Sequence, residues 1–372
     1  MAAVKKRQSN IELLRIVTMM MIIMLHLLDK GEVLPWFGDM HSFNDYFSWY
    51  VEALCIISVN VYVFISGYFL LDSKFTFKKL FFIVAQVWFY SVGIFLLCYF
   101  TGGIPAEDIN IYSLIMMFLP VLGNHYWFAT TYVLLMLVFP FLNTFIKAMD
   151  EKRHRRLIII LVIIFSLWVT VLPVTNPVVD KWGMDLPWFV VLYFIASYMK
   201  KYPDRLKGKA WGYLLTYALV STIPLIFARV LIGINNHFGK LGGYSKLWYQ
   251  YNVIPVVIMS IAFFVFFLKI DIKNKVISNI INFVARATFG VYLIHEHLYV
   301  RFRWTSLFDP KKYFDKPYWI LRAIGIVIIM FVVCASIDIV RIYLFKLLFD
   351  NPLCNKLWSK FGKIEDKING QD

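Results

Sequence analysis

An arginine and a histidine stand eleven positions apart in the apolar stretch ELLRIVTMMMIIMLHLLDK, residues 12–30. On an α-helix, eleven steps of 100° end about 20° beyond three full turns, so Arg15 and His26 project from nearly the same face. Their separation along the helix axis is about 16–17 Å. Ionisable side chains are costly inside a membrane and usually mark function there. The spacing therefore predicts an inward-facing track with a cation at one end and an imidazole at the other.

Each residue type suits a definite chemistry. Arginine is always charged and binds phosphate well, whereas histidine is the usual general base for a hydroxyl near neutral pH. A donor with a phosphorylated head and a long arm fits this track, and acyl-coenzyme A has that shape. Two structural alternatives remain open. Arg15 can extend to the lipid headgroups or pair with Glu12 at i, i+3 spacing. His26 can be a histidine near the membrane interface whose hydrogen bonds are all satisfied.

The composition is that of a membrane protein. Of the 372 residues 60% are hydrophobic and 16% charged, whereas soluble domains average about 45–50% apolar and about 25% charged. The net charge of +15 would suit nucleic-acid binding in a soluble protein, but here its distribution over the loops matters more, and we expect no nucleic-acid partner. The four cysteines lack CxxC spacing, which disfavours a disulfide framework or a zinc site.

Hydropathy predicts an all-α polytopic bundle, because a helix needs about 20 residues to cross a bilayer. About ten candidate spans follow, of which the sixth is short: residues 11–29, 50–71, 79–101, 126–146, 156–174, 186–200, 211–233, 250–269, 279–300 and 318–348. The apolar residues 110–122 are too few to span and are expected to be re-entrant or interfacial.

The positive-inside rule predicts that both termini are cytoplasmic. With that orientation the inner segments and their helix ends carry 24 Lys and Arg residues and the outer segments nine. Residues 1–348 then form the transmembrane domain and residues 349–372 a charged cytoplasmic tail. Five of the nine outer charges fall in the loop 301–317. Either the topology simply tolerates these charges in a loop late in the chain, or they form a basic surface for an anionic acceptor.

Four motifs in order along the chain resemble the acyltransferase-3 family of membrane O-acyltransferases. They are NIELLRIVTMMMIIMLH with Glu12, Arg15 and His26, VYVFISGYFLL, HYWFATTYVLLMLVFPFL, and FGVYLIH at residues 289–295. The resemblance covers essentially the whole chain. It implies transfer of an acyl group, usually acetyl, from cytoplasmic acyl-coenzyme A to a hydroxyl of a cell-surface polysaccharide or lipid-linked oligosaccharide. It also implies a multi-pass protein of the bacterial plasma membrane.

The family's essential arginine and histidine fall on Arg15 and His26. Its basic cluster, thought to hold the coenzyme phosphates, matches Lys74, Lys78 and Lys79 in SKFTFKKLFF. The family commonly has an arginine pair at that position, where this chain has lysines. A role in topology alone also suits these lysines, because any cytoplasmic loop should be basic. Some members carry a fused soluble domain after the last span. This chain stops about 24 residues beyond it, so transfer directly to the acceptor or through a separate partner is expected.

In the predicted mechanism His26 takes the proton of an acceptor hydroxyl, with acylation of the histidine itself as a variant. Candidates for the acceptor side are Glu52, His125, Trp127 and His295, although each also suits a structural role. On a continuous helix His295 and His297 would point about 200° apart, so no metal site is predicted. Asp338 and Arg341, three residues apart, are expected to pair.

Other functions fit less well. A transporter or flippase of lipid-linked oligosaccharide would also have many spans and buried charges, but such proteins often show repeated halves, and this sequence has no internal repeat. A glycan polymerase would be expected to carry a large outer loop. Besides its substrates, the expected partners are membrane lipid and possible further copies of the chain.

Overall fold

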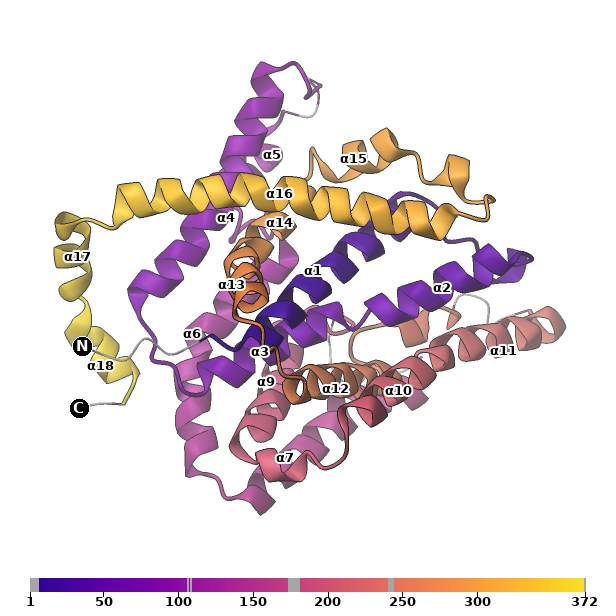
Figure 1. Ribbon diagram of the computed structural model, residues 1–372, viewed down its shortest axis with the longest axis horizontal. Coiled ribbons are helices and arrows are strands. Elements are labelled where there is room, and N and C mark those ends of the chain that lie inside the picture. The colour runs from indigo at the N-terminus through magenta and orange to yellow at the C-terminus, as the bar shows by residue number, and fades with distance from the viewer. Residues whose placement is uncertain (1–6, 106, 108, 173–180, 240–243, 371–372) are drawn as a thin grey trace.

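The computed structural model describes residues 7–105, 107, 109–172, 181–239 and 244–370, and over these residues it contains helices and no strand. Figure 1 shows the helices and their order. The α-helices are α1 (Ser9–Lys30), α2 (Phe43–Cys55), α3 (Ser58–Leu70), α4 (Phe77–Phe100), α5 (Ile111–Phe118), α6 (Trp127–Ala148), α7 (Glu151–Val162), α8 (Trp168–Val171), α9 (Leu186–Lys201), α10 (Ala210–Val220), α11 (Thr222–Phe238), α12 (Ile254–Lys269), α13 (Lys275–Val284), α14 (Thr288–His295), α15 (Arg301–Phe308), α16 (Trp319–Phe349), α17 (Pro352–Ser359) and α18 (Gly362–Ile368).

The predicted all-α polytopic bundle is confirmed. In the described part of the chain nine helical stretches are long and apolar enough to cross a membrane: Ser9–Lys30, Phe43–Leu70, Phe77–Phe100, Trp127–Ala148, Glu151–Val171, Ala210–His237, Leu247–Lys269, Lys275–His295 and Trp319–Phe349. The remaining predicted span, the sixth (186–200), is α9, whose 16 residues correspond to about 24 Å. Residues 173 and 174, at the predicted end of the fifth span, and Lys5 and Lys6 lie outside the described residues.

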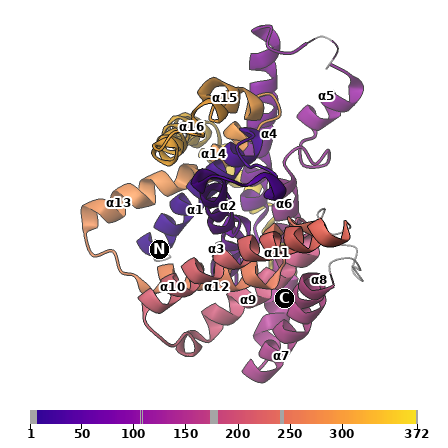
Figure 2. The same ribbon diagram turned by 90° about the vertical axis from the view of Figure 1, so that its right-hand side faces the viewer.

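Helix α1 lies at the centre of the bundle. It contacts α2, α3, α12, α13, α14 and α16, and Figures 1 and 2 show it surrounded by these helices. Two thirds (67%) of its most apolar 18-residue window is buried, compared with 17% for the span 151–171. Glu12 is buried and the side chain of His26 is only 22% exposed, so protein shields much of both side chains from lipid, as the cost of ionisable groups in hydrocarbon requires.

Several predicted spans differ from the structure, the seventh for example by a break at Ser221 between α10 and α11, and two of these differences shape the site. The second span begins at Phe43 and is broken between Cys55 and Ser58, where α2 gives way to α3. The ninth ends at His295, five residues earlier than predicted, and a turn leads to α15 at Arg301. Hydropathy misses both features because the residues at the break and several in the turn are themselves apolar.

The short stretch predicted not to span forms α5, which has eight residues. Asn110 caps its start through a reciprocal bond with Ser113. The Ser91 hydroxyl of α4 donates to the carbonyl of Met117 at 2.8 Å, so α5 folds back against α4.

The C-terminal tail returns to the start of α4. Asn369 accepts from the backbone N–H of Phe75 at 2.8 Å and donates to its carbonyl at 3.0 Å. Glu365 accepts from the backbone N–H of Phe77, the first residue of α4, at 2.7 Å. A carboxylate at a helix amino end satisfies an otherwise free N–H, so the tail completes this helix.

Candidate active site

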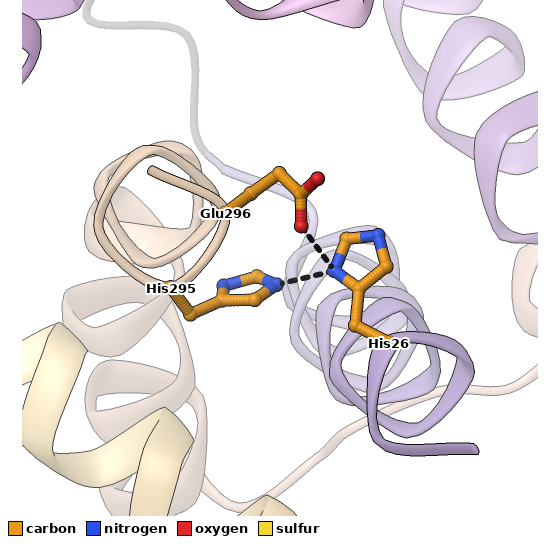
Figure 3. A group of neighbouring side chains, drawn as sticks. All are labelled: His26, His295 and Glu296. Atoms are coloured by element: carbon orange, nitrogen blue, oxygen red, sulfur yellow. Dashed lines mark hydrogen bonds and ion pairs between the residues drawn. The ribbon is translucent and has the colours of Figure 1, made fainter. Parts of the chain in front are cut away.

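His26 is joined to two residues from the other end of the sequence. Its Nδ1 lies 3.0 Å from Nε2 of His295 and 3.1 Å from Oε2 of Glu296. Figure 3 shows both side chains converging on the same imidazole nitrogen, with the other ring nitrogen of His26 directed away from them. The pair reaches His26 because α14 packs against α1 and ends at His295.

The hydrogen bonds determine which nitrogens carry protons in the neutral cluster. Nδ1 of His295 is 2.6 Å from the carbonyl oxygen of Val291, an acceptor, so this nitrogen carries the hydrogen. Nε2 of His295 must then accept, and Nδ1 of His26 donates to it. The Nε2 atom of His26 is left with its lone pair, which is the form a general base requires.

The Glu296 carboxylate is held by two cations besides contacting His26. Lys30, one turn after His26 on α1, donates to its Oε2, and Arg301 Nη1 lies 3.5 Å from its Oε1. Side-chain exposure is 15% for Glu296 and 22% for His26. In such a partly dehydrated site a fixed carboxylate can orient an imidazole and stabilise the imidazolium that forms when the imidazole takes a proton.

His26, His295 and Glu296 place one ligand atom each within 4.8 Å of one another, a spacing that a metal ion could use. In the neutral cluster Nδ1 of His26 carries a hydrogen and Nε2 of His295 accepts it, so neither nitrogen has a lone pair free for a metal ion. The arrangement is better suited to holding His26 than to holding an ion.

A narrow cavity of about 40 Å³ lies beside His26. From α1 it is lined by Met19, Ile22, Leu25 and His26, with Met19, Ile22 and His26 at helical spacing along one face. The other walls come from α3, α6, the segment before α12, and the region of α14: Ser58, Val59, Tyr62, Trp127, Phe128, Tyr251, Phe289 and Tyr292. Trp127, predicted on the acceptor side, therefore shares a cavity with His26.

Arg15 lies one turn before Met19 on the same face of α1. The predicted pair with Glu12 is present, with 3.7 Å between Arg15 Nε and Glu12 Oε2, and Arg7 contacts the other oxygen of Glu12 at 3.5 Å. Arg15 Nε is buried and has no hydrogen-bond partner among the described residues. Tyr62, which lines the cavity, donates to the Arg15 carbonyl at 2.9 Å. This contact ties the arginine's backbone to the cavity wall.

The three predicted phosphate-binding lysines lie around the start of α4, beside the tail. Lys78 donates to Oδ1 of Asn355 at 3.1 Å, and Lys79 donates to the carbonyl of Lys74 at 2.9 Å. Lys74 lines a separate pocket with Lys147. The contacts described here bring none of the three to Arg15, and their role in holding phosphate stays a prediction.

Glu52 and His125 do not line the cavity beside His26. Glu52 interacts electrostatically with Asp29 and Lys246. The His125 ring packs 4.2 Å from that of Tyr126 and 5.1 Å from that of His297. Burial, together with His297, lowers the pKa of His125 to about 3, so this imidazole is neutral at neutral pH.

His297 has different neighbours from His295. Its Nε2–H donates to the Ser91 carbonyl at 3.1 Å, and its Nδ1 accepts from the backbone N–H of Tyr299 at 3.2 Å. Although α14 has ended before His297, the two histidines still do not converge on one point.

The basic loop 301–317, predicted to lie on the outer side, is largely engaged within the protein. Arg301 contacts Glu296, Arg303 donates to the carbonyl of Gly103, and Lys311 pairs with Glu32 at 3.2 Å. These contacts favour a structural role for the loop charges over a free anionic surface. The predicted pair of Asp338 and Arg341 is confirmed at 2.8 Å.

Sequence reasoning did not assign a role to Glu296 or Lys30. Two weak signals existed. Glu296 directly follows His295 of the FGVYLIH motif, and Lys30 lies four residues after His26 on the same helix face. Neither signal shows that residues 26 and 296 meet.

Comparison with known proteins places the chain in a family. Neither a curated protein nor a solved structure matches it significantly. A family model described as an acyltransferase domain matches residues 8–339, a range that contains Arg15, the cavity and the cluster around His26. The chain therefore belongs to the acyltransferase-3 family, and it is a multi-pass membrane acyltransferase.

Proposed function

We propose that the protein moves an acetyl group from cytoplasmic acetyl-coenzyme A to a hydroxyl of an extracytoplasmic polysaccharide, at the bacterial plasma membrane. The observation that carries this proposal is the state of His26. Its Nδ1 is engaged by His295 and Glu296, which leaves Nε2 as a base beside a cavity inside a membrane acyltransferase.

The donor is proposed to enter along α1. Arg15 binds a phosphate of the coenzyme, for which its buried and unbonded Nε is suited. The extended pantetheine arm follows the face that carries Met19 and Ile22 and brings the thioester to His26. The axial distance of about 16–17 Å between Arg15 and His26 matches a donor whose charged head and reactive end are far apart. Lys74, Lys78 and Lys79 are proposed as further phosphate contacts.

In the proposed reaction His26 Nε2 removes the proton of the acceptor hydroxyl as its oxygen attacks the thioester carbon. The C–O bond forms, the C–S bond breaks, and the sulfur leaves with its electron pair and takes the proton from the imidazolium. Glu296 stabilises that imidazolium, and His295 keeps Nδ1 engaged. Trp127 contacts the acceptor from the cavity wall, and Glu52 and His125 are proposed contacts farther out.

The test is acetyl transfer by the purified full-length protein in lipid vesicles, with His26→Ala compared with wild type. The variant should lose transfer yet remain in the membrane. His237→Ala changes an exposed histidine far from α1 in sequence and should retain full activity. Near-normal transfer by His26→Ala would overturn the proposal. Movement of lipid-linked oligosaccharide without consumption of acetyl-coenzyme A would instead favour a flippase.

A second variant tests the phosphate contact. Arg15→Lys keeps the charge but loses the planar, bidentate geometry, so KM for acetyl-coenzyme A should rise roughly tenfold with a smaller change in kcat. Arg153→Lys, at a highly exposed position, should change neither constant. An unchanged KM for Arg15→Lys would count against phosphate binding at this residue.

A further inference from the structure

Two buried hydroxyl groups line the cavity beside His26 without using their hydrogens. Ser58 is 0% exposed, and the side chain of Tyr292 is almost as deeply buried, in a residue only 5% exposed. Neither Ser58 Oγ nor the Tyr292 hydroxyl has a hydrogen-bond partner within the described part of the chain. Leaving a buried polar group unpaired costs free energy, so such groups call for an explanation.

Several other hydroxyls in the surrounding helices are bonded within the protein. Tyr62, on the same cavity, donates to Arg15. Tyr126, at the start of α6, donates to the Leu293 carbonyl at 2.9 Å. Ser260, buried on α12, donates to Val256 at 2.6 Å. The free hydroxyls of Ser58 and Tyr292 thus differ from nearby hydroxyls whose role is structural.

A helix amino end faces the same cavity. Helix α6 begins at Trp127 with no side-chain cap, and its first two residues, Trp127 and Phe128, are part of the lining. The first N–H groups of a helix have no partner inside it and carry partial positive charge. The Phe128 ring packs 5.8 Å from that of Tyr292, so the first turn of α6 and the Tyr292 side chain border the same cavity.

The hydroxyls of Ser58 and Tyr292 are held by helices that pack around the base, His26. Ser58 is the first residue of α3, directly after the break that follows α2. Tyr292 lies three residues before His295 on α14, so the helix that supplies Tyr292 also holds His26. Donors and base therefore meet around one small cavity, a condition for stabilising charge that develops next to a reacting base.

We propose that Ser58 and Tyr292 form the oxyanion hole of the acyl-transfer reaction, with the amino end of α6 supporting them. This inference rests on the proposed function. When the acceptor oxygen adds to the thioester carbon, the π electrons of the C=O bond move to oxygen, and Ser58 Oγ–H and Tyr292 O–H donate to that oxyanion. When the C=O bond re-forms, the C–S bond breaks, sulfur takes its electron pair, and the donors release the oxygen.

The experiment measures release of free thiol from acetyl-coenzyme A by the purified full-length protein, with water as the acceptor. It therefore needs no identified glycan. Ser58→Ala and Tyr292→Phe each remove one hydroxyl and nothing else. Each should lower kcat about 100-fold and leave KM for acetyl-coenzyme A within about threefold, because the hydrogen bonds strengthen only in the transition state.

Stability separates this role from a structural one. Because the hydroxyls are unpaired, Ser58→Ala and Tyr292→Phe should melt at or above the wild-type temperature in detergent. Matched controls are Ser48→Ala and Tyr217→Phe. Those hydroxyls donate to the carbonyls of Asp45 and Leu54 at 2.8 Å, so removing them should lower the melting temperature and preserve kcat.

The possible results are distinct. If Ser58→Ala and Tyr292→Phe keep the wild-type kcat while His26→Ala is inactive, the oxyanion hole is refuted and the proposed function stands. If kcat and melting temperature fall together, the hydroxyls are structural and the inference is wrong. If the wild type neither hydrolyses nor transfers the acetyl group, the proposed function fails and this inference fails with it.

Discussion

At the scale of single residues, the site is organised around one nitrogen of His26. Nδ1 of His26 lies within 3.1 Å of both His295 and Glu296, whereas Nε2 is directed away from them (Figure 3). The hydrogen bond with His295 fixes the tautomer of His26, and Glu296 supplies a negative charge beside the ring. This division resembles the support that a carboxylate gives to a catalytic imidazole in hydrolases, where it orients the ring and stabilises the imidazolium.

Replacing Glu296 by Gln should therefore lower kcat about 10- to 100-fold. The amide keeps the size of the side chain but removes the negative charge that stabilises the imidazolium. KM for acetyl-coenzyme A should change little, and steady-state acetyl transfer measures both constants. Glu32→Gln, which alters an exposed partner of Lys311, is the matched control. An unchanged kcat for Glu296→Gln would show that the carboxylate has no part in the reaction.

Because His297 is buried, we expect the stability of the folded protein to depend on pH. Burial, with smaller contributions from Arg301 and Arg303, lowers the pKa of His297 to about 4. The neutral ring uses both nitrogens, one as donor and one as acceptor. In the unfolded chain its pKa is about 6.5. Below that value the unfolded state takes up the proton first, so this contribution to the free energy of unfolding is present above about pH 6.5 and declines toward pH 4.

Thermal unfolding in detergent between pH 7 and pH 5 measures this effect. The wild type should lose melting temperature as the pH falls. His297→Gln, which keeps a donor and an acceptor but does not titrate, should lose less. His125 has a lowered pKa as well and should account for part of the remaining slope. Identical slopes in wild type and His297→Gln would contradict the assignment.

At the scale of elements, α14 packs closely against a buried carboxylate of α16. Asp338 accepts from Gln86 and Tyr90 of α4 at 3.2 and 2.8 Å and pairs with Arg341. Gly290 of the FGVYLIH motif faces this cluster, and a Cβ atom there would lie 2.0 Å from the Asp338 carboxyl group. The glycine is thus required by close packing of α14 on α16.

Gly290→Ala should consequently destabilise the protein by at least 1–3 kcal/mol, the usual cost of overpacking a core, because backbone and carboxylate must both move. Activity should fall too, since α14 carries His295. Gly325→Ala, on α16 where no atom lies within 4 Å of an added Cβ, should be neutral or slightly stabilising. Equal melting temperatures for the two variants would refute the packing argument.

At the scale of the whole molecule, two contacts join segments that are far apart in sequence, one at α1 and one at the start of α4. His26 and His295 are 269 positions apart in sequence, and Phe75 and Asn369 are 294 apart. The tail thereby closes over the start of α4, beside the lysines predicted to bind phosphate. Figure 1 shows α17 and α18 leaving the end of α16 and returning toward the rest of the bundle.

The double variant Glu365→Ala, Asn369→Ala should lower the melting temperature by a few degrees, because backbone groups of Phe75 and Phe77 lose their partners. Thermal unfolding in detergent is the measurement. Asp366→Ala removes an adjacent, exposed carboxylate and should have no effect. If the double variant melts like wild type, the tail is not part of the folded core.

Local sequence patterns determined much of this protein. Apolar length predicted the helical membrane bundle, because a backbone in lipid must satisfy its hydrogen bonds within the helix. Helical spacing predicted that Arg15 and His26 share a face and that Glu12–Arg15 and Asp338–Arg341 pair. Ordered motifs indicated the family. All of these depend on residues close together in sequence or on a single helix.

Only the tertiary structure decided which side chains surround His26. The roles proposed for Glu296, Ser58 and Tyr292 depend on two helix interruptions and on the packing of α1 against α3 and α14. Hydropathy cannot locate a break inside an apolar run, and a lone serine or tyrosine in a span has no local feature that marks it as unpaired. Whether a hydroxyl is bonded depends on atoms supplied by remote segments, and the folded chain alone brings those atoms together.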